Sequence, residues 1–460
     1  MANPTPEYGD AILKVETYGI ERIAMQERHG TSRSQFTLWL GANLTIADFA
    51  LGFLPISMGL SWWWSIGALL VGNLLGAIAI GLCAAMGPSY GLPQLMISRF
   101  SFGRRGGYAP SFLNYLTTLG WFTVNNILGA FGIQILFHGL SFWEAAAIMV
   151  ILEAVLAVYG HNLIHSFEKL MAAVLSAVFI VVTIIALTHS HTLASYAPHV
   201  KNPLVIAGII LGASFSYLAS WGAYASDYSR YLAPKTSKIS IGSWAFLGAF
   251  IATFWLEIVG MLVGILSAPH NSNPIAALNT VMGGFGAVAI IAIILGGIAA
   301  NVLNIYSNAL CAGALDLRLP RWRLAIVAGL LGFIFSVIGS GNFDANYENY
   351  LYLIGYWVTP WLGILVADFY IKHHGRLAAT DVRDRKSVNA AGLITWMIGV
   401  LVMFPFMNSP FFEGFIAKAL SGVDISYYVG FVVAGGLYLV VARNLNQSGH
   451  ASPVTAEVSS

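Results

Sequence analysis

The chain has 460 residues, of which 57% are hydrophobic and 9% are charged, and its net charge is +2. Soluble domains carry roughly 25% charged residues, so this composition excludes an ordinary soluble protein, and the near-neutral balance argues against nucleic-acid binding. A lipid bilayer solvates an apolar exterior, which makes an all-α membrane protein the expected class.

Residues 1–35 are polar and mixed in charge, and they lack the basic-then-apolar pattern of a signal peptide, so we expect a cytoplasmic N-terminal tail. Twelve apolar windows follow, each near or above the ~20 residues that cross the hydrocarbon core. The windows are residues 36–58, 63–87, 109–137, 142–160, 166–188, 203–226, 240–266, 283–314, 322–340, 347–371, 390–408 and 425–442. Residues 443–460 are predicted to form a cytoplasmic C-terminal tail.

The basic residues test this number of spans. If both termini are cytoplasmic, all 22 lysines and arginines except Lys201 and Lys418 fall on the cytoplasmic side. The positive-inside rule demands such a bias, and a wrong number of spans would destroy it. The sequence therefore predicts a multi-pass protein of the plasma or inner membrane with 12 transmembrane helices.

Three carboxylates lie inside predicted spans: Asp48 in the first, Glu153 in the fourth and Glu257 in the seventh. Burying a charge in hydrocarbon costs at least ~2.5–3.5 kcal/mol. Each carboxyl therefore either ties helices together through hydrogen bonds or belongs to a substrate, cation or proton site. Asp48 is the first candidate for function because its helix looks broken, and Glu153 best fits the structural role.

Polar uncharged residues gather in spans 1, 3, 6 and 8. Asn301, Asn304 and Asn308 are spaced by three and four residues, so their amides share one helix face. Unpaired amides are costly in lipid, which favours a face toward a polar cavity. Trp121 and Tyr217 could be packing residues, but beside amides they suit a flat polar ring, since aromatic faces stack and amides both donate and accept.

Glycine-containing polar interruptions in spans 1 and 6 are typical of five-plus-five inverted-repeat transporters, in which the first helix of each repeat is broken at the midplane. On this interpretation spans 1–5 (residues 36–188) form the first repeat and spans 6–10 (residues 203–371) the second. Spans 11 and 12 (residues 390–442) are additional. We find no strong internal sequence repeat that would prove the arrangement.

Several motifs, in order along residues 15–443, resemble the first nucleobase–cation symporter family, and the first of them resembles its purine–cytosine permease branch. They are VETYGIER (15–22), SRFSFGRRG (98–106), GWFTVN (120–125), SDYSRY (226–231), NVLNIYSNAL (301–310) and LIGYWVTPWLGILVADFY (353–370).

The resemblance implies a leucine-transporter-type fold, with a ten-helix core plus two C-terminal helices, and symport of a nucleobase such as cytosine or a purine. It makes Trp121 the stacking aromatic of span 3. The polar positions that it implies near substrate or cation are Thr45, Thr118, Asn125 and Asn301. The residue facing Trp121 from span 6 is either Tyr217 or Leu218.

The coupling ion is where this sequence departs from part of that family. The sodium-coupled relatives use span 1 carbonyls at positions matching Gly41 and Leu44, with adjacent hydroxyl residues on span 8. Those span 8 positions are Asn304 and Ile305 here, and isoleucine has no side-chain oxygen. A proton is therefore favoured over sodium, with Asp48 or Glu257 as its carrier.

Three alternatives stay open. One is a sodium-coupled symporter of a related heterocycle, and another is an amino-acid or amine transporter of the same fold, which would need a site for a carboxylate or ammonium group. A membrane-embedded enzyme is disfavoured, because the spans contain neither a His-rich metal cluster nor a nucleophile with an evident base. Cys83 and Cys311 lie in apolar segments and indicate neither a disulfide framework nor a metal site. We also expect no cofactor and no catalytic residue.

Overall fold

The computed structural model describes residues 9–267, 273–317, 319–375, 387–409 and 411–448. Within these residues the protein is helical, apart from loops and a short antiparallel hairpin of β1 (Asn408–Ser409) and β2 (Phe412–Glu413). A helix suits the long apolar segments because it satisfies its own backbone N–H and C=O groups in lipid. The predictions for residues 376–386 and 449–460 lie outside the described residues.

Helices make up most of the described residues. In the first half of the chain they are η1 (Met25–Glu27), α1 (Ser34–Asn43), α2 (Ile46–Ser57), α3 (Trp62–Ala84), α4 (Gly87–Tyr90), α5 (Gln94–Phe102), α6 (Tyr108–Leu136), α7 (Phe142–Tyr159), α8 (His161–Thr188) and α9 (Ser190–Ala194). In the second half they are α10 (Pro203–Trp221), η2 (Gly222–Tyr224), α11 (Ala225–Ser229), α12 (Lys238–Ser267), α13 (Pro274–Met282), η3 (Gly283–Phe285), α14 (Gly286–Ala314), α15 (Arg321–Gly339), η4 (Ser340–Asn342), α16 (Phe343–Val366), the π-helix η5 (Ala367–Lys372), α17 (Ala390–Met403), η7 (Phe404–Phe406), α18 (Phe415–Ala419) and α19 (Ser426–Ser448).

Nine helical stretches among the described residues are long and apolar enough to cross a membrane, and α1 with α2 forms a tenth candidate that is bent by 56°. Two shorter apolar helices follow, Ala390–Phe406 and Ser426–Ala442. These segments lie close to the twelve apolar windows of the sequence. The fifth begins earlier than expected, at His161, and the eighth is preceded by α13. The structure thus establishes an all-helical membrane protein with nine to ten candidate spans.

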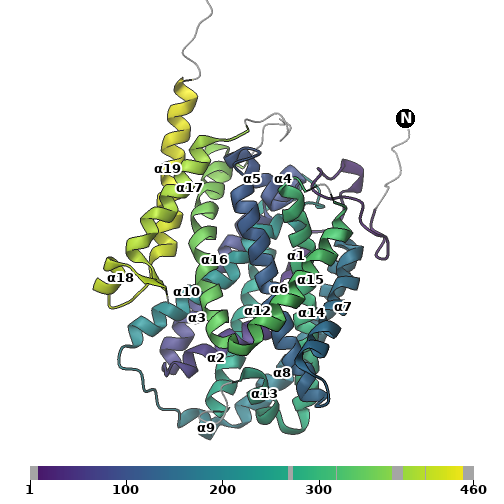
Figure 1. The fold of residues 1–460 in the computed structure, drawn as a ribbon, viewed down its shortest axis with the longest axis vertical. Coiled ribbons are helices and arrows are strands. Elements are labelled where there is room, and N and C mark those ends of the chain that lie inside the picture. The colour runs from purple at the N-terminus through teal and green to yellow at the C-terminus, as the bar shows by residue number, and fades with distance from the viewer. Residues whose placement is uncertain (1–8, 268–272, 318, 376–386, 410, 449–460) are drawn as a thin grey trace, which may run out of the picture.

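Helices that are distant in sequence form the core of the bundle. α10 packs on α3, α14 on α6, and α12 on α2. A Cβ atom added to Gly52 of α2 would overlap the backbone of Glu257 in α12, so glycine lets these two helices touch through their backbones. α17 and α19 pack together and against α16, at the left edge of Figure 1.

The N-terminal tail is not merely a polar extension, because residues 9–33 dock against the bundle; we call this segment the N-terminal strap. The backbone N–H of Ile23 donates to the carbonyl of Gly91 (2.9 Å) and that of His29 donates to the carbonyl of Tyr231 (2.7 Å). The guanidinium of Arg28 donates to the carbonyl of Leu232 at 3.0 Å. Burial, together with the neighbouring positive charges, lowers the pKa of Arg28 to about 10.

A buried ion pair holds the strap in place. Glu16 accepts a hydrogen bond from the guanidinium of Arg230 at 2.9 Å, and both side chains are fully buried. The hydroxyls of Tyr231 (2.5 Å) and Tyr306 (3.0 Å) donate to the same carboxylate oxygen, and the backbone N–H of His161 donates to the other at 3.1 Å. The described part of the predicted N-terminal tail is therefore docked, because Glu16 meets a positive charge and hydrogen-bond donors on α8, α14 and the segment after α11.

Figure 1 shows that the strap and the end of α19 lie at the same end of the bundle, opposite α9 and α13. α19 continues to Ser448, beyond the predicted end of the last span.

Candidate functional site

The first span is broken between α1 and α2, as its glycine and threonine residues indicate. α1 ends at Asn43, and α2 begins at Ile46 with Thr45 as its N-cap in an extended conformation. The Thr45 hydroxyl accepts from the backbone N–H groups of Ala47 (3.2 Å) and Asp48 (3.5 Å). This cap satisfies N–H groups that the break leaves without helical partners.

The break lies directly against two other helices. A Cβ atom added to Gly296 of α14 would overlap the carbonyl oxygen of Leu44, and one added to Gly41 would overlap the carboxyl group of Glu168 on α8. Small residues at these two positions allow the closest approach of the helices. The Gly41 and Leu44 positions therefore contact α8 and α14, respectively.

Asp48 forms a small polar cluster with residues of two helices. Its Oδ2 atom accepts from the Thr45 hydroxyl at 2.7 Å and from the Tyr217 hydroxyl at 2.7 Å. All three side chains are buried, and Oδ1 of Asp48 has no hydrogen-bond partner. Asp48 thus lies at the break and is bonded to α10.

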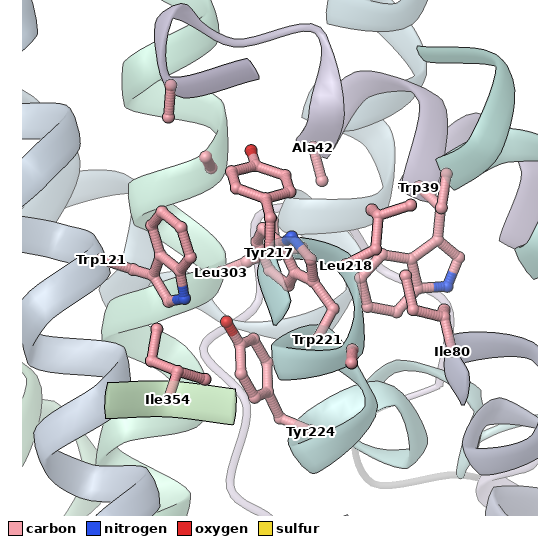
Figure 2. Packing of buried hydrophobic residues seen from close by; sticks show 14 of the residues in the cluster. Trp39, Ala42, Ile80, Trp121, Tyr217, Leu218, Trp221, Tyr224, Leu303 and Ile354 are labelled. Atoms are coloured by element: carbon pink, nitrogen blue, oxygen red, sulfur yellow. The ribbon is translucent and has the colours of Figure 1, made fainter. Parts of the chain in front are cut away.

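Trp121 of α6 lies among tyrosine rings. Its ring centroid is 4.8 Å from that of Tyr217 and 5.1 Å from that of Tyr350, and both pairs are inclined by 78°. Figure 2 shows Tyr217 beside Trp121, whereas Leu218 lies on the opposite side of Tyr217, toward Trp39. Of the two candidates on span 6, Tyr217 therefore faces Trp121 and Leu218 does not.

Two further bonds fix this aromatic cluster. The indole N–H of Trp121 donates to the hydroxyl of Ser220 at 3.0 Å. The hydroxyl of Tyr347 on α16 donates to the carbonyl of Ala47, in the first turn of α2, at 3.1 Å. The rings of Trp121 and Tyr347 lie 6.3 Å apart. α2, α6, α10 and α16 therefore meet around Trp121.

Asn301 of α14 is the centre of an amide network. Its amide N–H groups donate to the carbonyl of Phe122 (3.0 Å) and to Glu153 on α7 (2.9 Å). Its Oδ1 atom accepts from the amides of Asn125 (3.3 Å) and Asn304 (3.2 Å). Asn301 thus uses both donors and both acceptor positions within the protein.

The two amides next to Asn301 differ in whether all their polar side-chain atoms have hydrogen-bond partners. Asn304 accepts from the hydroxyl of Tyr224 at 3.2 Å and donates to Asn301, so both its polar atoms are paired. Asn125 donates to the carbonyl of Trp121 at 3.1 Å and to Asn301, but its Oδ1 is buried without a partner. Asn125 is therefore the member of the network that can still accept a hydrogen bond.

Thr118 and Asn308 are bonded to each other, one turn toward the N-terminus of α6. The amide of Asn308 donates to the Thr118 hydroxyl at 2.9 Å and to the carbonyl of Tyr115 at 2.9 Å. The Thr118 hydroxyl in turn donates to the carbonyl of Asn114 at 3.0 Å. Thr118 therefore links α6 to α14 in this state.

Glu257 lies apart from the aromatic cluster, at the contact of α12 with α2 and α3. The amide of Asn73 on α3 donates to its Oε2 atom, and Oε1 has no partner. The predicted coupling residues Asp48 and Glu257 are thus attached to different sets of hydrogen-bond partners.

A further buried carboxyl within the long apolar helices, Glu168, was missed by the sequence reasoning. It is fully buried on α8, and neither of its oxygens has a hydrogen-bond partner. The sequence prediction starts this span at residue 166, which makes Glu168 and the adjacent Lys169 membrane-boundary residues. Gly160 as a break, with a helix of 28 residues after it, is the signal that would have placed Glu168 inside the span.

Among the described residues, no ion pair involves Asp48, Glu153, Glu168 or Glu257, and no cluster of His, Cys, Asp or Glu is arranged to hold a metal ion.

A family described as "Permease for cytosine/purines, uracil, thiamine, allantoin" matches residues 22–430. YxlA of Bacillus subtilis is 30% identical over 443 residues, which cover 94% of this chain and 96% of YxlA. The purine-cytosine permease fcyB of Emericella nidulans is 27% identical over 453 residues, which cover 93% of this chain and 88% of fcyB.

The fold is similar to that of Mhp1, a nucleobase-cation-symport-1 family transporter solved in a closed conformation with bromovinylhydantoin bound. The TM-score is 0.79 at 18% identity, over 95% of this chain and 96% of Mhp1. This likeness confirms the leucine-transporter-like fold that the sequence motifs imply. Because the family match spans most of its length, the chain belongs to the family of permeases for cytosine/purines, uracil, thiamine and allantoin.

Proposed function

We propose that the protein is a secondary active transporter that imports a nucleobase, cytosine or a purine, by proton symport through alternating access. The observation that carries the proposal is the position of Tyr217. Its hydroxyl donates to the buried carboxyl of Asp48, and its ring lies 4.8 Å from the ring of Trp121. A candidate proton site and a candidate stacking site thus share one side chain.

The proposed architecture has 12 spans, because the two shorter C-terminal helices add to the nine long helices and the broken span. Residues 36–188 and 203–371 would be the inverted repeats, residues 390–442 the two additional spans, and residues 1–35 and 443–460 the terminal segments. The strong asymmetry of lysines and arginines supports cytoplasmic termini in a plasma or inner membrane. The common position of the strap and the end of α19 agrees with this topology.

The proposed substrate site uses Trp121 as a stacking surface, which supplies about 1–3 kcal/mol by analogy with base–aromatic stacking. Asn125 offers its free Oδ1, an acceptor for a ring N–H or an exocyclic amino group of the base. Thr45 lies beside the pair of Asp48 and Tyr217, where it can contact the base from the broken span. Thr118 and Asn301 are saturated with protein partners, so they position the site in this state.

A proton is proposed as the coupling ion because the buried carboxyls lack counter-charges. An unpaired carboxylate is costly in a membrane interior, so Asp48 and Glu257 should carry protons in this state. At the place where the resemblance puts the ion of sodium-coupled relatives, Asn304 is bonded to Asn301 and Tyr224, and Ile305 has no side-chain oxygen. Hard cations require several oxygen ligands, which this arrangement supplies poorly.

Uptake of labelled cytosine into proteoliposomes containing the purified protein tests the proposal. We expect uptake to follow an inward proton gradient, to be abolished by a protonophore and to ignore a sodium gradient. Unlabelled purines and pyrimidines should compete, whereas amino acids should not.

Uptake that follows sodium and ignores protons would overturn the choice of ion. Competition by amino acids or amines, with no effect of bases, would instead favour a transporter of amino acids or amines with the same fold.

A further inference from the structure

Glu153 contacts the proposed substrate site from outside the aromatic cluster. It lies on α7, whose neighbouring side chains Ile151, Leu152 and Val155 are 63%, 48% and 57% exposed and so face lipid. Glu153 itself is fully buried. Its carboxyl therefore points into the bundle from a helix that otherwise borders the membrane.

Among the described residues, the Glu153 carboxyl makes one hydrogen bond. The amide of Asn301 donates to Oε1 at 2.9 Å, and Oε2 is buried without a partner. A carboxyl that only tied helices together would gain more if both its oxygens were bonded. The free oxygen instead leaves one position that a proton can occupy.

The helices α6, α8, α14 and α15 pack against α7. Among the described side chains, their titratable groups are Tyr108 and Tyr115 on α6, His161, His165, Glu168 and Lys169 on α8, Tyr306 and Cys311 on α14, and Arg323 on α15. α7 itself carries Glu144 and Tyr159. No described hydrogen bond or ion pair joins any of them to Glu153, so Asn301 is its polar neighbour.

Asn301 transmits the state of Glu153 to the substrate site. Its amide group divides its two donors between Glu153 and the carbonyl of Phe122, and its Oδ1 holds the amide of Asn125. An ionised carboxylate attracts a donor roughly twice as strongly as a neutral one. Loss of the proton should therefore turn the Asn301 amide toward Glu153 and disturb the bond that orients Asn125.

We propose that Glu153 is a proton site whose occupancy orients Asn125 through Asn301, so that proton binding and base binding favour each other. We call Glu153, Asn301 and Asn125 the amide relay. Glu153 is a positioning residue in it, since it reaches the base only through the two amides. The inference rests on the proposed function and adds a proton site to the candidates Asp48 and Glu257, one whose effect passes through the amides rather than through Tyr217.

The test compares Glu153→Gln with wild type in two assays on the full chain. Glutamine keeps an oxygen acceptor for Asn301 but cannot ionise. Cytosine affinity of the purified wild-type protein should weaken as the pH rises. Above the pH at which the Glu153 carboxyl loses its proton, the affinity should fall by up to about tenfold per pH unit. In Glu153→Gln the fall in cytosine affinity per pH unit should be smaller by a factor of at least about three. Cytosine exchange across the membrane should persist, while uphill uptake driven by a proton gradient should fall about tenfold or more.

Glu144→Gln is the matched control, since Glu144 lies on the same helix α7 but bonds to Ser141 at the start of that helix and not to the amide relay. Its cytosine affinity should keep the wild-type pH dependence. If Glu153→Gln also keeps both that dependence and proton-driven uptake, the inference is wrong. A wild-type protein that ignores the proton gradient would refute the proposed function instead, so the two failures are distinguishable.

Glu153→Asp covers the case in which Glu153→Gln does not fold, as judged by size-exclusion chromatography. The shorter carboxyl can still ionise but holds Asn301 less well. We expect proton-driven uptake to persist with a shifted pH midpoint for cytosine affinity. An unchanged midpoint would overturn the amide relay.

Discussion

Tyr217→Phe separates the two roles that the structure combines in one side chain. The change removes the hydroxyl that donates to Asp48 at 2.7 Å but keeps the ring beside Trp121. A hydrogen bond to a charged group contributes about 1.5–3 kcal/mol, and here it stabilises the carboxylate more than the acid. Each 1.36 kcal/mol corresponds to one pH unit, so the pH of half-maximal uptake should rise by about one to two units.

The assay is the initial rate of cytosine uptake into proteoliposomes across a series of external pH values. Tyr350→Phe is the control, because Tyr350 also lies against Trp121 but its hydroxyl donates to the backbone carbonyl of Thr117. Its pH profile should match wild type. Identical profiles for both variants and wild type would refute the link between Asp48 and uptake. A large loss of cytosine affinity in Tyr217→Phe without a pH shift would show that the hydroxyl contacts the base instead.

Three other changes give direct tests. Glu16→Gln removes the carboxylate that pairs with the buried guanidinium of Arg230, which costs about 3–5 kcal/mol of stability. The strap should then become accessible to protease and to hydrogen exchange. Glu21→Gln, at an exposed position of the strap, should leave both unchanged. Equal protection of the strap in both variants would contradict this. Trp121→Ala and Asn301→Ala should each abolish cytosine uptake with normal expression, because one removes the stacking ring and the other the centre of the amide network. Normal uptake by either variant would remove that residue from the proposed site.

The spans could be predicted closely because their signal is local. An apolar run of about 20 residues is required wherever a helix crosses hydrocarbon. Gly41 and Thr45 indicate the interruption of the helix before Asp48. The break between α1 and α2 is found there. The family resemblance could also be recognised, since its motifs occur in order along the chain.

The partners of the buried groups could not be predicted, because they depend on helix rotation and on contacts between distant segments. A rotation of about 100° separates consecutive helix residues, and this decides that Tyr217 rather than Leu218 faces Trp121. The bond from Asn301 to Glu153 joins residues 148 positions apart. No periodicity in either helix reports that pairing, so the sequence could not identify Asn301 as the partner of Glu153.

The docked strap also has a consequence for how the protein is made. Glu16 leaves the ribosome early, but Arg230 and Tyr306, which bind it, follow 214 and 290 residues later. At about 5–20 residues per second, synthesis of the last of these partners takes roughly 15–60 s. During that interval the strap lacks the residues that bind it, so membrane insertion of the early helices cannot depend on strap docking. Its docking marks the moment when α14 has been synthesised and has joined the bundle.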